Sequence, residues 1–470
     1  MGRFALPLLP LRRLKNLLIQ QTDAIVEQLC HATGKPAVEA LASDVLVCVD
    51  VLNYYDTHAE EILATAQRPG VGLYRLNRFE VSHEPYGVVA VIAPWNHPLQ
   101  LSLVPLASAL VAGNTVLLKP SQLTPTVGQL LERFCREAGL PPGVVQVLQG
   151  DGGVGQALIE AGPDLVFFTG SVASGRAVMH AAAEHPVPVH LELGGKDPMI
   201  VFADARLKRA AQGAVWGAFA HAGQNCVAVE RLYVERSVHD RFVGLVADAA
   251  RELRVGSGME VDFGPLVLPA QLELVQAQIQ EAVDAGAEAV VRAEPRGNLL
   301  GPTVLTGVDH HMRVMREETF GPVLPIMAFT DEDEVVGLAN DSPYGLNASV
   351  WTSDQARARR VAHALETGNV AINDVLKNIG NPSTPFGGVK QSGFGRYHGP
   401  EGLRAFCRPK TVMTNPQILP REPNWFPYGE STYQALKILI HALHSDADGL
   451  KKLGQLARGV GSAIFKRSKE

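Results

Sequence analysis

Four short apolar runs, VVAVIAP (88–94), NTVLLKPS (114–121), VVQVLQG (144–150) and LVFFTGS (165–171), follow one another in the first half of the chain. The segments between them have helical character, as in TPTVGQLLERFCREAGL (124–140). Short buried strands that alternate with helices are typical of βαβ units, whose strands form a parallel sheet. This part of the chain is therefore predicted to form an α/β domain.

The flanking segments extend this pattern. Strand-like character continues in HLELGGKDPMIVFADA (190–205) and NVAIND (369–374), with the helical AAQGAVWGAFAHAG (210–223) between them. Residues 11–66 have apolar side chains at helical spacing. Residues 68–94 alternate between apolar and polar side chains and contain several Gly and Pro. The first of these predicts helix, and the second a hairpin that feeds a buried strand. We therefore expect two α/β lobes.

The composition is that of a globular protein. Of the 470 residues, 46% are hydrophobic and 19% are charged, which is enough apolar material for two or three domains. The formal net charge of −6 indicates no general nucleic-acid affinity. No uncharged apolar run reaches the length of about 18 residues that predicts a transmembrane helix. The start, 1–18, mixes basic and apolar residues but has two prolines and no small-residue cleavage site, so it is interpreted as part of the domain.

The cysteines are few and widely spaced. Cys30, Cys48, Cys135, Cys226 and Cys407 contain no CxxC pair. This spacing argues against a zinc site and against a disulfide framework. We therefore expect no metal, and a reducing compartment such as the cytoplasm.

Cys226 and Glu192 occupy unusual settings. Cys226 lies in HAGQNCVAVE (221–230), between amide residues and a short apolar run. A lone cysteine is more often a small buried hydrophobe than a nucleophile, and this segment alone leaves both interpretations open. Glu192 lies between two leucines in LELGGKDP (191–198). It is either a solvent-facing residue at a sheet edge or a buried carboxylate, whose raised pKa would make it a usable general base.

Asn96 and two glycine loops are further candidates. Asn96 follows a strand in APWNHPLQ (93–100), and its amide is a neutral donor of the kind that an oxyanion requires, although asparagine is also common in turns. GDGGVG (150–155) matches G-x-G-x-x-G but lacks the acidic residue expected about 20 positions later. FFTGSVASGR (167–176) is the better phosphate candidate, because a strand ends there in a glycine turn and a helix-capping serine.

Together these segments resemble the aldehyde dehydrogenase superfamily over about residues 10–412. The motifs PWNHP, LLKPSQ, FTGSVASG, LELGGK, GQNC, EETFGPV and PFGGVKQSGFGR occur in the superfamily's order, with 34 positions from Glu192 to Cys226. The resemblance implies an α/β fold with two Rossmann-like parallel-sheet domains and a small bridging β-sheet for oligomerisation. It also implies oxidation of an aldehyde to the carboxylic acid with NAD or NADP.

The resemblance also implies roles for individual residues. Cys226 would be the nucleophile that carries the thiohemiacetal and thioacyl intermediates. Asn96 and the Cys226 backbone N–H would hold the alkoxide, and Glu192 would activate the hydrolytic water. In the dinucleotide site, Glu318 would hold the nicotinamide ribose and Lys119 the adenine ribose. The full set of residues implied in dinucleotide binding is Trp95, Lys119, Gln122, Gly170, Ser171, Gly175, Glu318 and Phe320.

Some positions depart from the common pattern. Gln122 stands where many NAD-preferring members have a glutamate that would repel a 2′-phosphate, so the preference between NAD and NADP is open. Tyr397 stands where some members have a glutamate. RYHG (396–399) and NWFPYGESTYQALKILI (424–440) resemble the class-three, or fatty aldehyde, branch. The resemblance therefore implies medium- or long-chain aliphatic or aromatic aldehydes as substrates. A succinic semialdehyde-type dehydrogenase is the alternative, and a coenzyme A-acylating relative is a weaker one.

The family architecture implies domain boundaries and an assembly. The dinucleotide-binding domain would comprise 1–66 and 86–193, and the catalytic domain 194–391. Bridging elements would comprise 67–85 and 392–415, followed by an extension, 416–470. Because the bridging strand would pair between subunits, a homodimer or homotetramer is expected.

The end of the chain is basic. Residues 449–470 contain six Lys or Arg and one acid, Glu470, and their apolar residues recur at helical spacing. This pattern fits a docked C-terminal helix, and it also fits a surface helix that binds anionic lipid. The sequence thus predicts a cytoplasmic enzyme that acts on a small-molecule aldehyde, with the tail as a candidate for peripheral membrane contact.

Overall fold

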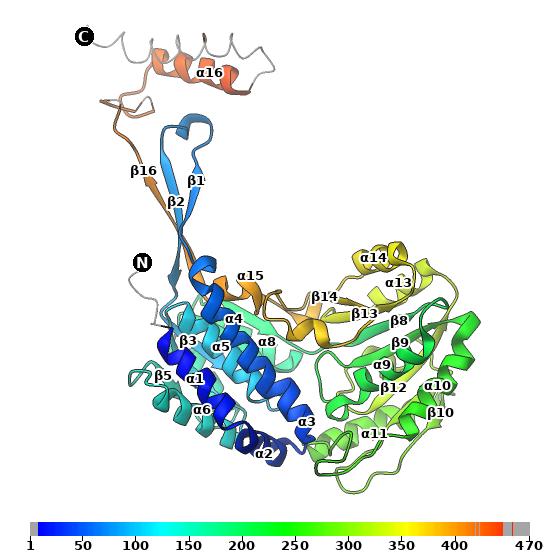
Figure 1. Ribbon diagram of the computed structural model, residues 1–470. Helices are drawn as coiled ribbons and strands as arrows, with labels where there is room; N and C mark the ends of the chain where they lie inside the picture. Colours follow the sequence, from blue (N-terminus) through cyan, green and yellow to red (C-terminus); the bar gives the residue numbers. More distant parts are fainter. Residues whose placement is uncertain (1–7, 419, 423, 445–453, 455–470) are drawn as a thin grey trace. The chain divides into compact units, whose positions relative to one another are not determined.

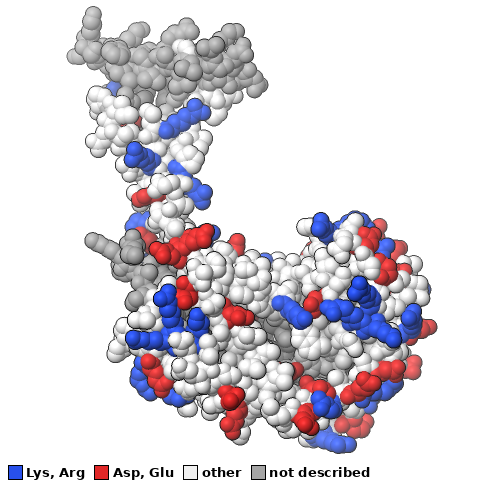
Figure 2. Space-filling view, viewed as in Figure 1, with Lys and Arg blue, Asp and Glu red and all other residues white. Residues whose placement is uncertain are grey.

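The computed structural model describes residues 8–418, 420–422, 424–444 and 454. The chain divides into two compact units, one made of 1–63 and 83–408 and the other of 64–82 and 409–470. Figure 1 shows the elements of each unit. On the face of the first unit seen in Figure 2, basic and acidic side chains are interspersed.

The chain opens with helices whose apolar stripes are buried. The predicted helical segment forms α1 (Leu9–Gln20), α2 (Thr22–Thr33), α3 (Ala37–Glu39), the π-helix η1 (Ala40–Leu46) and α4 (Val47–Ile62). Leu14, Leu18 and Leu29 recur at helical spacing and are fully buried. α2 ends at Gly34, whose φ of 71° is left-handed. α1 and α2 pack on α6 (Pro125–Glu137), and α4 packs on α5 (Gln100–Val111).

The first parallel sheet comes from the apolar runs that the sequence singled out. Among the described residues it has the order β15 (Gly393–Phe394), β7 (Val189–Glu192), β6 (Leu165–Thr169), β3 (Val88–Ile92), β4 (Thr115–Lys119), β5 (Val145–Val147). Its connecting helices are α5 (Gln100–Val111), α6 (Pro125–Glu137), α7 (Gly152–Glu160) and α8 (Val172–Ala183). Strands β3 to β7 are parallel, as predicted, and β15 is antiparallel to β7.

The order of these strands creates a crevice. The chain runs from β3 outward through β4 and β5, then returns to β6 on the other side of β3. Right-handed crossovers therefore place α5 and α6 on one face and α7 and α8 on the other. Ligands bind to such sheets beyond the carboxyl ends of the strands at this switch point, here between β3 and β6.

The second sheet is also mostly parallel. Among the described residues its order is β10 (Glu288–Val291), β11 (Thr303–Thr306), β12 (Val323–Phe329), β9 (Val229–Glu235), β8 (Asp197–Val201), β13 (Asn347–Trp351), β14 (Asn369–Ile372). Only β10 is antiparallel to its neighbour within this described sheet. Its helices are α9 (Leu207–Phe219), the 3₁₀ turn η3 (Ala220–Gly223), α10 (His239–Arg251), α11 (Pro269–Asp284), α12 (Arg313–Arg316), α13 (Glu332–Asn340) and α14 (Gln355–Ala364). Figure 1 shows α9, α10 and α11 on one face and α13 and α14 on the other.

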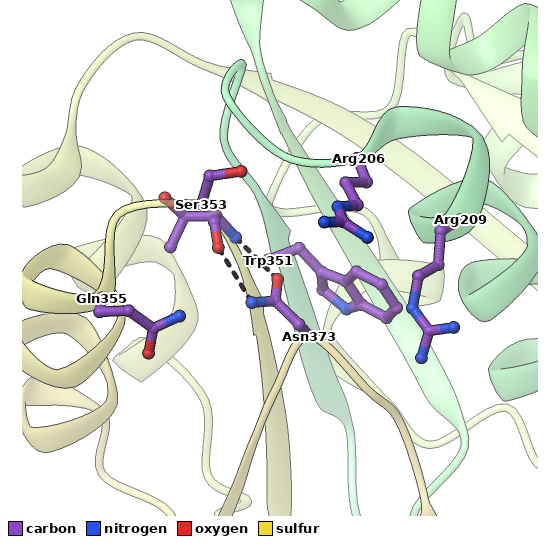
Figure 3. A pocket seen from close by; sticks show the side chains of 7 residues that line it. Arg206, Arg209, Trp351, Ser353, Gln355 and Asn373 are labelled. Carbon is purple, nitrogen blue, oxygen red and sulfur yellow. Dashed lines mark hydrogen bonds between the residues drawn. The ribbon is translucent and has the colours of Figure 1, made fainter.

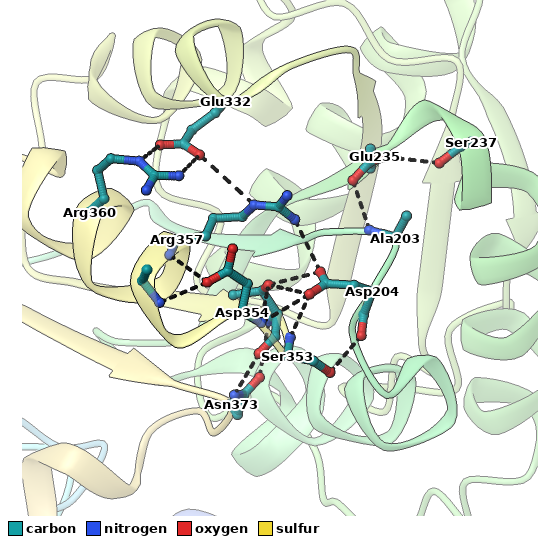
Figure 4. A network of polar contacts seen from close by, with 12 residues as sticks. Ala203, Asp204, Glu235, Ser237, Glu332, Ser353, Asp354, Arg357, Arg360 and Asn373 are labelled. Atoms are coloured by element: carbon teal, nitrogen blue, oxygen red, sulfur yellow. Dashed lines mark hydrogen bonds and ion pairs between the residues drawn. The ribbon is translucent and has the colours of Figure 1, made fainter.

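The turn from β13 into α14 is held by a polar network around Asp204. The Asp204 carboxylate accepts hydrogen bonds from Thr352 Oγ1 at 2.8 Å and from Ser353 N at 2.9 Å, and it pairs with Arg357 at 3.2 Å (Figure 4). Asp354 then caps α14 by accepting from the Ala356 and Arg357 amides. The network orders the helix start, and none of the predicted catalytic residues belongs to it.

The two parallel sheets are joined at residues 193–196. The Leu193 amide donates to Ser392 O at 3.0 Å, and Ser392 Oγ donates to Gly194 O at 2.7 Å. β15 begins directly after Ser392 and extends the first sheet. β16 (Cys407–Thr414) instead joins the small antiparallel sheet. The exact domain boundaries stay a prediction.

The predicted hairpin is present. β1 (Ala66–Pro69) pairs antiparallel with β2 (Arg78–Pro85), and β2 neighbours β16. α15 (Gly399–Arg404) precedes β16, and α16 (Glu430–His444) follows it. Among the described residues, no helix is long and apolar enough to cross a membrane. Apart from Gly454, the basic helix predicted over 449–470 lies outside the described residues.

Candidate active site

Cys226 lies in a rigid loop between η3 and β9. η3 contains two non-glycine residues with left-handed backbone, His221 at φ 52° and Ala222 at φ 56°. Such conformations cost free energy and persist where other contacts enforce them. Here the buried Gln224 side chain donates to His221 O at 3.0 Å and accepts from the Val267 amide at 2.9 Å. The loop that carries the sulfur is therefore fixed before any ligand binds.

The Cys226 thiol is partly buried among acidic groups. Burial raises the pKa of Cys226 above its ordinary value, and the charges of Asp197, Glu318 and Glu192 raise it further. The thiol is therefore protonated at neutral pH in the unliganded protein. A Cβ on Gly195 would lie only 2.5 Å from the Cys226 carbonyl oxygen, so glycine is required where the sheet junction meets the cysteine loop.

Glu192 is the last residue of β7, and its side chain points into the protein. It is 3% exposed, and neither carboxylate oxygen has a hydrogen-bond partner among the described residues. Burial raises the pKa of Glu192 well above its ordinary value, and only the Arg396 charge opposes this rise. The interpretation of Glu192 as a solvent-facing edge residue is wrong, because β15 pairs on that side of β7. A buried carboxyl group without a partner is available for proton transfer.

Asn96 follows β3 and contacts the cysteine loop. Its side chain is buried, and Nδ2 donates to Gln224 O at 3.2 Å. That bond uses one of the two amide hydrogens, so the second remains for a ligand. The structure thus brings Asn96, Glu192 and Cys226 together from three distant parts of the chain.

Lys119 ends β4 and faces the switch-point crevice. Its side chain is buried, and Nζ has a hydrogen bond to Pro120 O at 3.1 Å. Desolvation lowers the pKa of Lys119, and the charge of Asp151 opposes this. Asp151 caps α7 by accepting from the Gly153 amide, so the GDGGVG loop lies beside Lys119. Gln122 is exposed, three residues beyond the strand end.

The second glycine loop leads from β6 into α8 as predicted. Ser171 caps α8 by accepting from the Ser174 amide at 3.2 Å. A Cβ on Gly175 would lie 2.6 Å from Leu193 Cδ2, so a larger residue in α8 would require the Leu193 side chain to shift. The Gly170 amide donates to Glu192 O at 3.0 Å. The start of α8 is thereby tied to the strand that ends in Glu192.

Glu318 and Phe320 lie between α12 and β12, and Trp95 follows β3. Glu318 Oε1 accepts from the Gly195 amide at 3.1 Å, and burial together with the Glu230 charge raises the pKa of Glu318 to about 8. The Phe320 ring meets the Trp95 ring edge to face, with centroids 5.7 Å apart. Five of the residues implied in dinucleotide binding lie at the carboxyl ends of strands of the first sheet or in the loops that follow them: Trp95, Lys119, Gln122, Gly170 and Ser171. Gly175 lies within α8, and Glu318 and Phe320 lie between α12 and β12.

A profile of the family described as "Aldehyde dehydrogenase family" matches residues 10–412, most of the chain. The chain belongs to the aldehyde dehydrogenase family. It is therefore an oxidoreductase, as the resemblance implied.

Three relatives of this aldehyde dehydrogenase show the range of the family. The 4,4′-diapolycopene aldehyde oxidase of Methylomonas sp. is 48% identical over 93% of this chain and 83% of its own. A Mycobacterium tuberculosis protein assigned as an NADP-dependent succinate-semialdehyde dehydrogenase is 36% identical over 86% of this chain and 79% of its own. The structure of an NAD-dependent aldehyde dehydrogenase from Sinorhizobium meliloti superposes with a TM-score of 0.84 at 33% identity, covering 89% and 83% of the two chains. The family thus uses NAD or NADP.

Sequence reasoning missed a buried ion pair behind Asn96. Lys35 Nζ lies 2.7 Å from Asp44 Oδ2 and donates to Asn96 O at 2.8 Å. Asp44 Oδ1 accepts from the amides of Leu99 and Gln100, so the pair holds both ends of the Asn96 turn. Asp44 lies in the π-helix, a rare form that is frequent at functional sites. Nothing in the spacing of these residues links them to Asn96 before the chain is folded.

Tyr397 was noted in the sequence for its departure from the family pattern, not for its burial. Its side chain is buried, and burial followed by the charges of Glu192 and Cys226 raises its pKa well above the ordinary value. Its phenol therefore stays protonated near Glu192 and Cys226. The departure from the family pattern at this position was the signal that the sequence contained.

A separate pocket lies on the second sheet. It has a volume of about 280 Å³ and is lined by Arg206, Arg209, Trp351, Thr352, Ser353, Gln355 and Asn373 (Figure 3). None of the predicted site residues lines it. In the part of the chain that the structure describes, no group of His, Cys, Asp and Glu is arranged to hold a metal ion.

Proposed function

We propose that Cys226 is the nucleophile of an aldehyde dehydrogenase that releases a free carboxylic acid. The observation that carries this proposal is the unpartnered, buried Glu192 carboxyl group, close enough for its charge to raise the pKa of Cys226. A thiolate attacks the aldehyde carbon after its proton has passed to solvent, and a thiohemiacetal forms. The second amide hydrogen of Asn96 and the Cys226 backbone N–H stabilise the oxyanion.

The residues around the crevice fit a nicotinamide dinucleotide. Lys119 Nζ is buried with hydrogens left for a ribose, the start of α8 offers backbone amides to a pyrophosphate, and the Glu318 carboxyl group can bind a second ribose. When bound, the dinucleotide supplies a two-electron acceptor. This chain's residues then hold the reacting carbon on Cys226.

Hydrolysis completes the reaction. Glu192 accepts a proton from water as the water oxygen attacks the thioester, and the acid and the Cys226 thiolate are released. An acyl-transferring relative would need to keep water from the thioester. The retained Glu192 argues for hydrolysis over transfer to coenzyme A.

We infer that both dinucleotides are accepted. The exposed Gln122 is neutral, so a 2′-phosphate near it meets no carboxylate charge from that position. Steady-state kinetics with each dinucleotide will show activity with both if this inference is right.

We further propose a neutral, apolar aldehyde as substrate. No cationic side chain is among the described groups with the largest effect on the Cys226 thiol, so no positive charge there pairs with an anionic substrate. The 48% identity to the diapolycopene aldehyde oxidase supports a long apolar chain, whereas the 36% identity to the succinate-semialdehyde relative supports the alternative.

The substrate proposal predicts the outcome of a kinetic comparison. Medium- and long-chain aliphatic and aromatic aldehydes should give a kcat/KM at least about tenfold above succinic semialdehyde, the gap expected for even a small difference in transition-state binding. The reaction products of these aldehydes should also be identified with and without coenzyme A. A preference for succinic semialdehyde would overturn the substrate proposal, and an acyl-coenzyme A product would overturn hydrolysis.

We propose a cytoplasmic homodimer or homotetramer. All five cysteines are free thiols, which supports a reducing compartment. β16 at the edge of the small sheet has exposed residues along most of its length, as expected of a strand that pairs with another subunit.

We propose that the basic tail, 449–470, contacts membranes that contain anionic lipid, and this contact can be tested. Full-length protein should co-sediment at low salt with vesicles that contain anionic lipid, and a variant ending at residue 448 should not, because six of its basic residues are removed. Turnover of a water-soluble aldehyde should be the same in both. Absence of vesicle binding by the intact chain would refute the contact, and vesicles of neutral lipid provide the control.

A further inference from the structure

Glu230 is a fully enclosed carboxylate on β9, four residues beyond Cys226. Its side chain is buried, and Oε2 lies 2.6 Å from Lys196 Nζ. Lys196 is also buried and donates to Thr319 Oγ1 at 2.9 Å. The pair carries no net charge. Lys196 supplies the counter-charge for the Glu230 carboxylate that solvent would otherwise have to stabilise.

The other contacts of Glu230 are to the backbone of a distant loop. Oε2 accepts from the Thr319 amide at 2.7 Å, and Oε1 accepts from the Phe320 amide at 2.9 Å. One carboxylate thus holds two successive N–H groups, and such charge-assisted bonds are stronger than neutral ones. These two amides directly follow Glu318.

The backbone that Glu230 holds is strained. Phe320 has a φ of 50°, in the left-handed region that a bulky side chain rarely adopts. Strained residues persist where their surroundings over-determine them, and they concentrate at ligand sites. The strained conformation presents the Phe320 ring to Trp95 and leaves the Glu318 carboxylate against the Gly195 amide.

We propose that Glu230, with Lys196 as its counter-charge, is a positioning residue that holds the Glu318–Phe320 segment in its dinucleotide-binding conformation. The proposal rests on the proposed role of Glu318 in binding a ribose. Glu230 itself touches no ligand, because its two oxygens are used by Lys196 and the two amides. Its role is to fix in advance a geometry that the dinucleotide would otherwise have to impose.

Dinucleotide binding without turnover is the first test. Glu230→Gln keeps the shape of the side chain but can accept only one of the two amides, because its NH₂ group is a donor. Its Kd for NAD, measured by calorimetric titration without aldehyde, should rise about 10- to 100-fold, as expected when a charged hydrogen bond is lost. In the matched control Glu317→Gln, whose exposed carboxylate pairs with Arg313, the Kd should not change.

A double substitution separates positioning from general damage. If Glu230 acts through Glu318, Glu230→Gln should add little to the loss of NAD affinity in a Glu318→Gln background. The KM for the aldehyde and the rate of Cys226 alkylation should stay near those of the wild type. Additive losses would overturn the proposal. An unchanged Kd in Glu318→Gln alone would instead refute the ribose role of Glu318.

A measurement on the wild-type protein covers the case in which the variant fails to fold. The Thr319 and Phe320 amides should exchange slowly with deuterium in the absence of any dinucleotide, because the Glu230 carboxylate already holds them. Fast exchange of these two amides in the unliganded protein would show that no such clamp exists.

Discussion

Replacement of Cys226 by alanine is expected to abolish aldehyde oxidation, with a loss of about 10⁴-fold or more, because it removes the sulfur that forms the proposed covalent intermediate. The loop should keep its structure, since Gln224 and its partners hold it without the sulfur. The measurement is steady-state formation of reduced dinucleotide, with thermal unfolding to verify the fold.

Cys30→Ala is the matched control. Cys30 lies on α2, is partly buried, and is not among the predicted site residues. This variant should retain wild-type activity. After a denaturing quench of wild-type turnover, mass spectrometry should find the acyl group on Cys226. Appreciable oxidation by Cys226→Ala, or an acyl group on a different side chain, would be incompatible with the proposed chemistry.

Replacement of Glu192 by glutamine should separate the two halves of the reaction. The first turnover should still release about one equivalent of reduced dinucleotide per Cys226, and subsequent turnover should slow about 10²- to 10⁴-fold, the usual contribution of a general base. Glu192 raises the pKa of Cys226 and does not lower it, so the replacement should not slow thiolate formation. The acyl-enzyme should therefore accumulate and be detectable after quenching.

The pH dependence follows from the raised pKa of Glu192. In the folded protein this carboxyl group stays protonated above its ordinary titration range, and only its ionised form accepts a proton from water. Hydrolysis of the wild-type acyl-enzyme should therefore speed up as pH rises through that raised pKa, and the Gln variant should lack this rise. Glu184→Gln, at an exposed position just after the end of α8, provides the control. Unchanged steady-state turnover in Glu192→Gln would assign hydrolysis to another base.

The comparison between sequence and structure is most informative at the junction of the two sheets. The apolar runs that start at Val88 and Leu165 form β3 and β6 as predicted, because their burial depends only on local composition and helical spacers. The pairing of Gly393 with Glu192 across β15 and β7 could not be predicted, since it joins segments about 200 residues apart. That pairing is one reason why Glu192 is buried and not exposed.

By itself, the sequence determined the alternation of strands and helices, the family, and the side chains able to act as nucleophile, base and donor. These are properties of residue type and order. Only the tertiary structure showed that Gly195 meets the Cys226 carbonyl, that Lys35 holds the Asn96 turn, and that Glu230 holds the Thr319 and Phe320 amides. The physical reason is that pKa values and hydrogen bonds depend on distances of a few ångströms between residues far apart in the chain, and such distances exist only once the chain is packed.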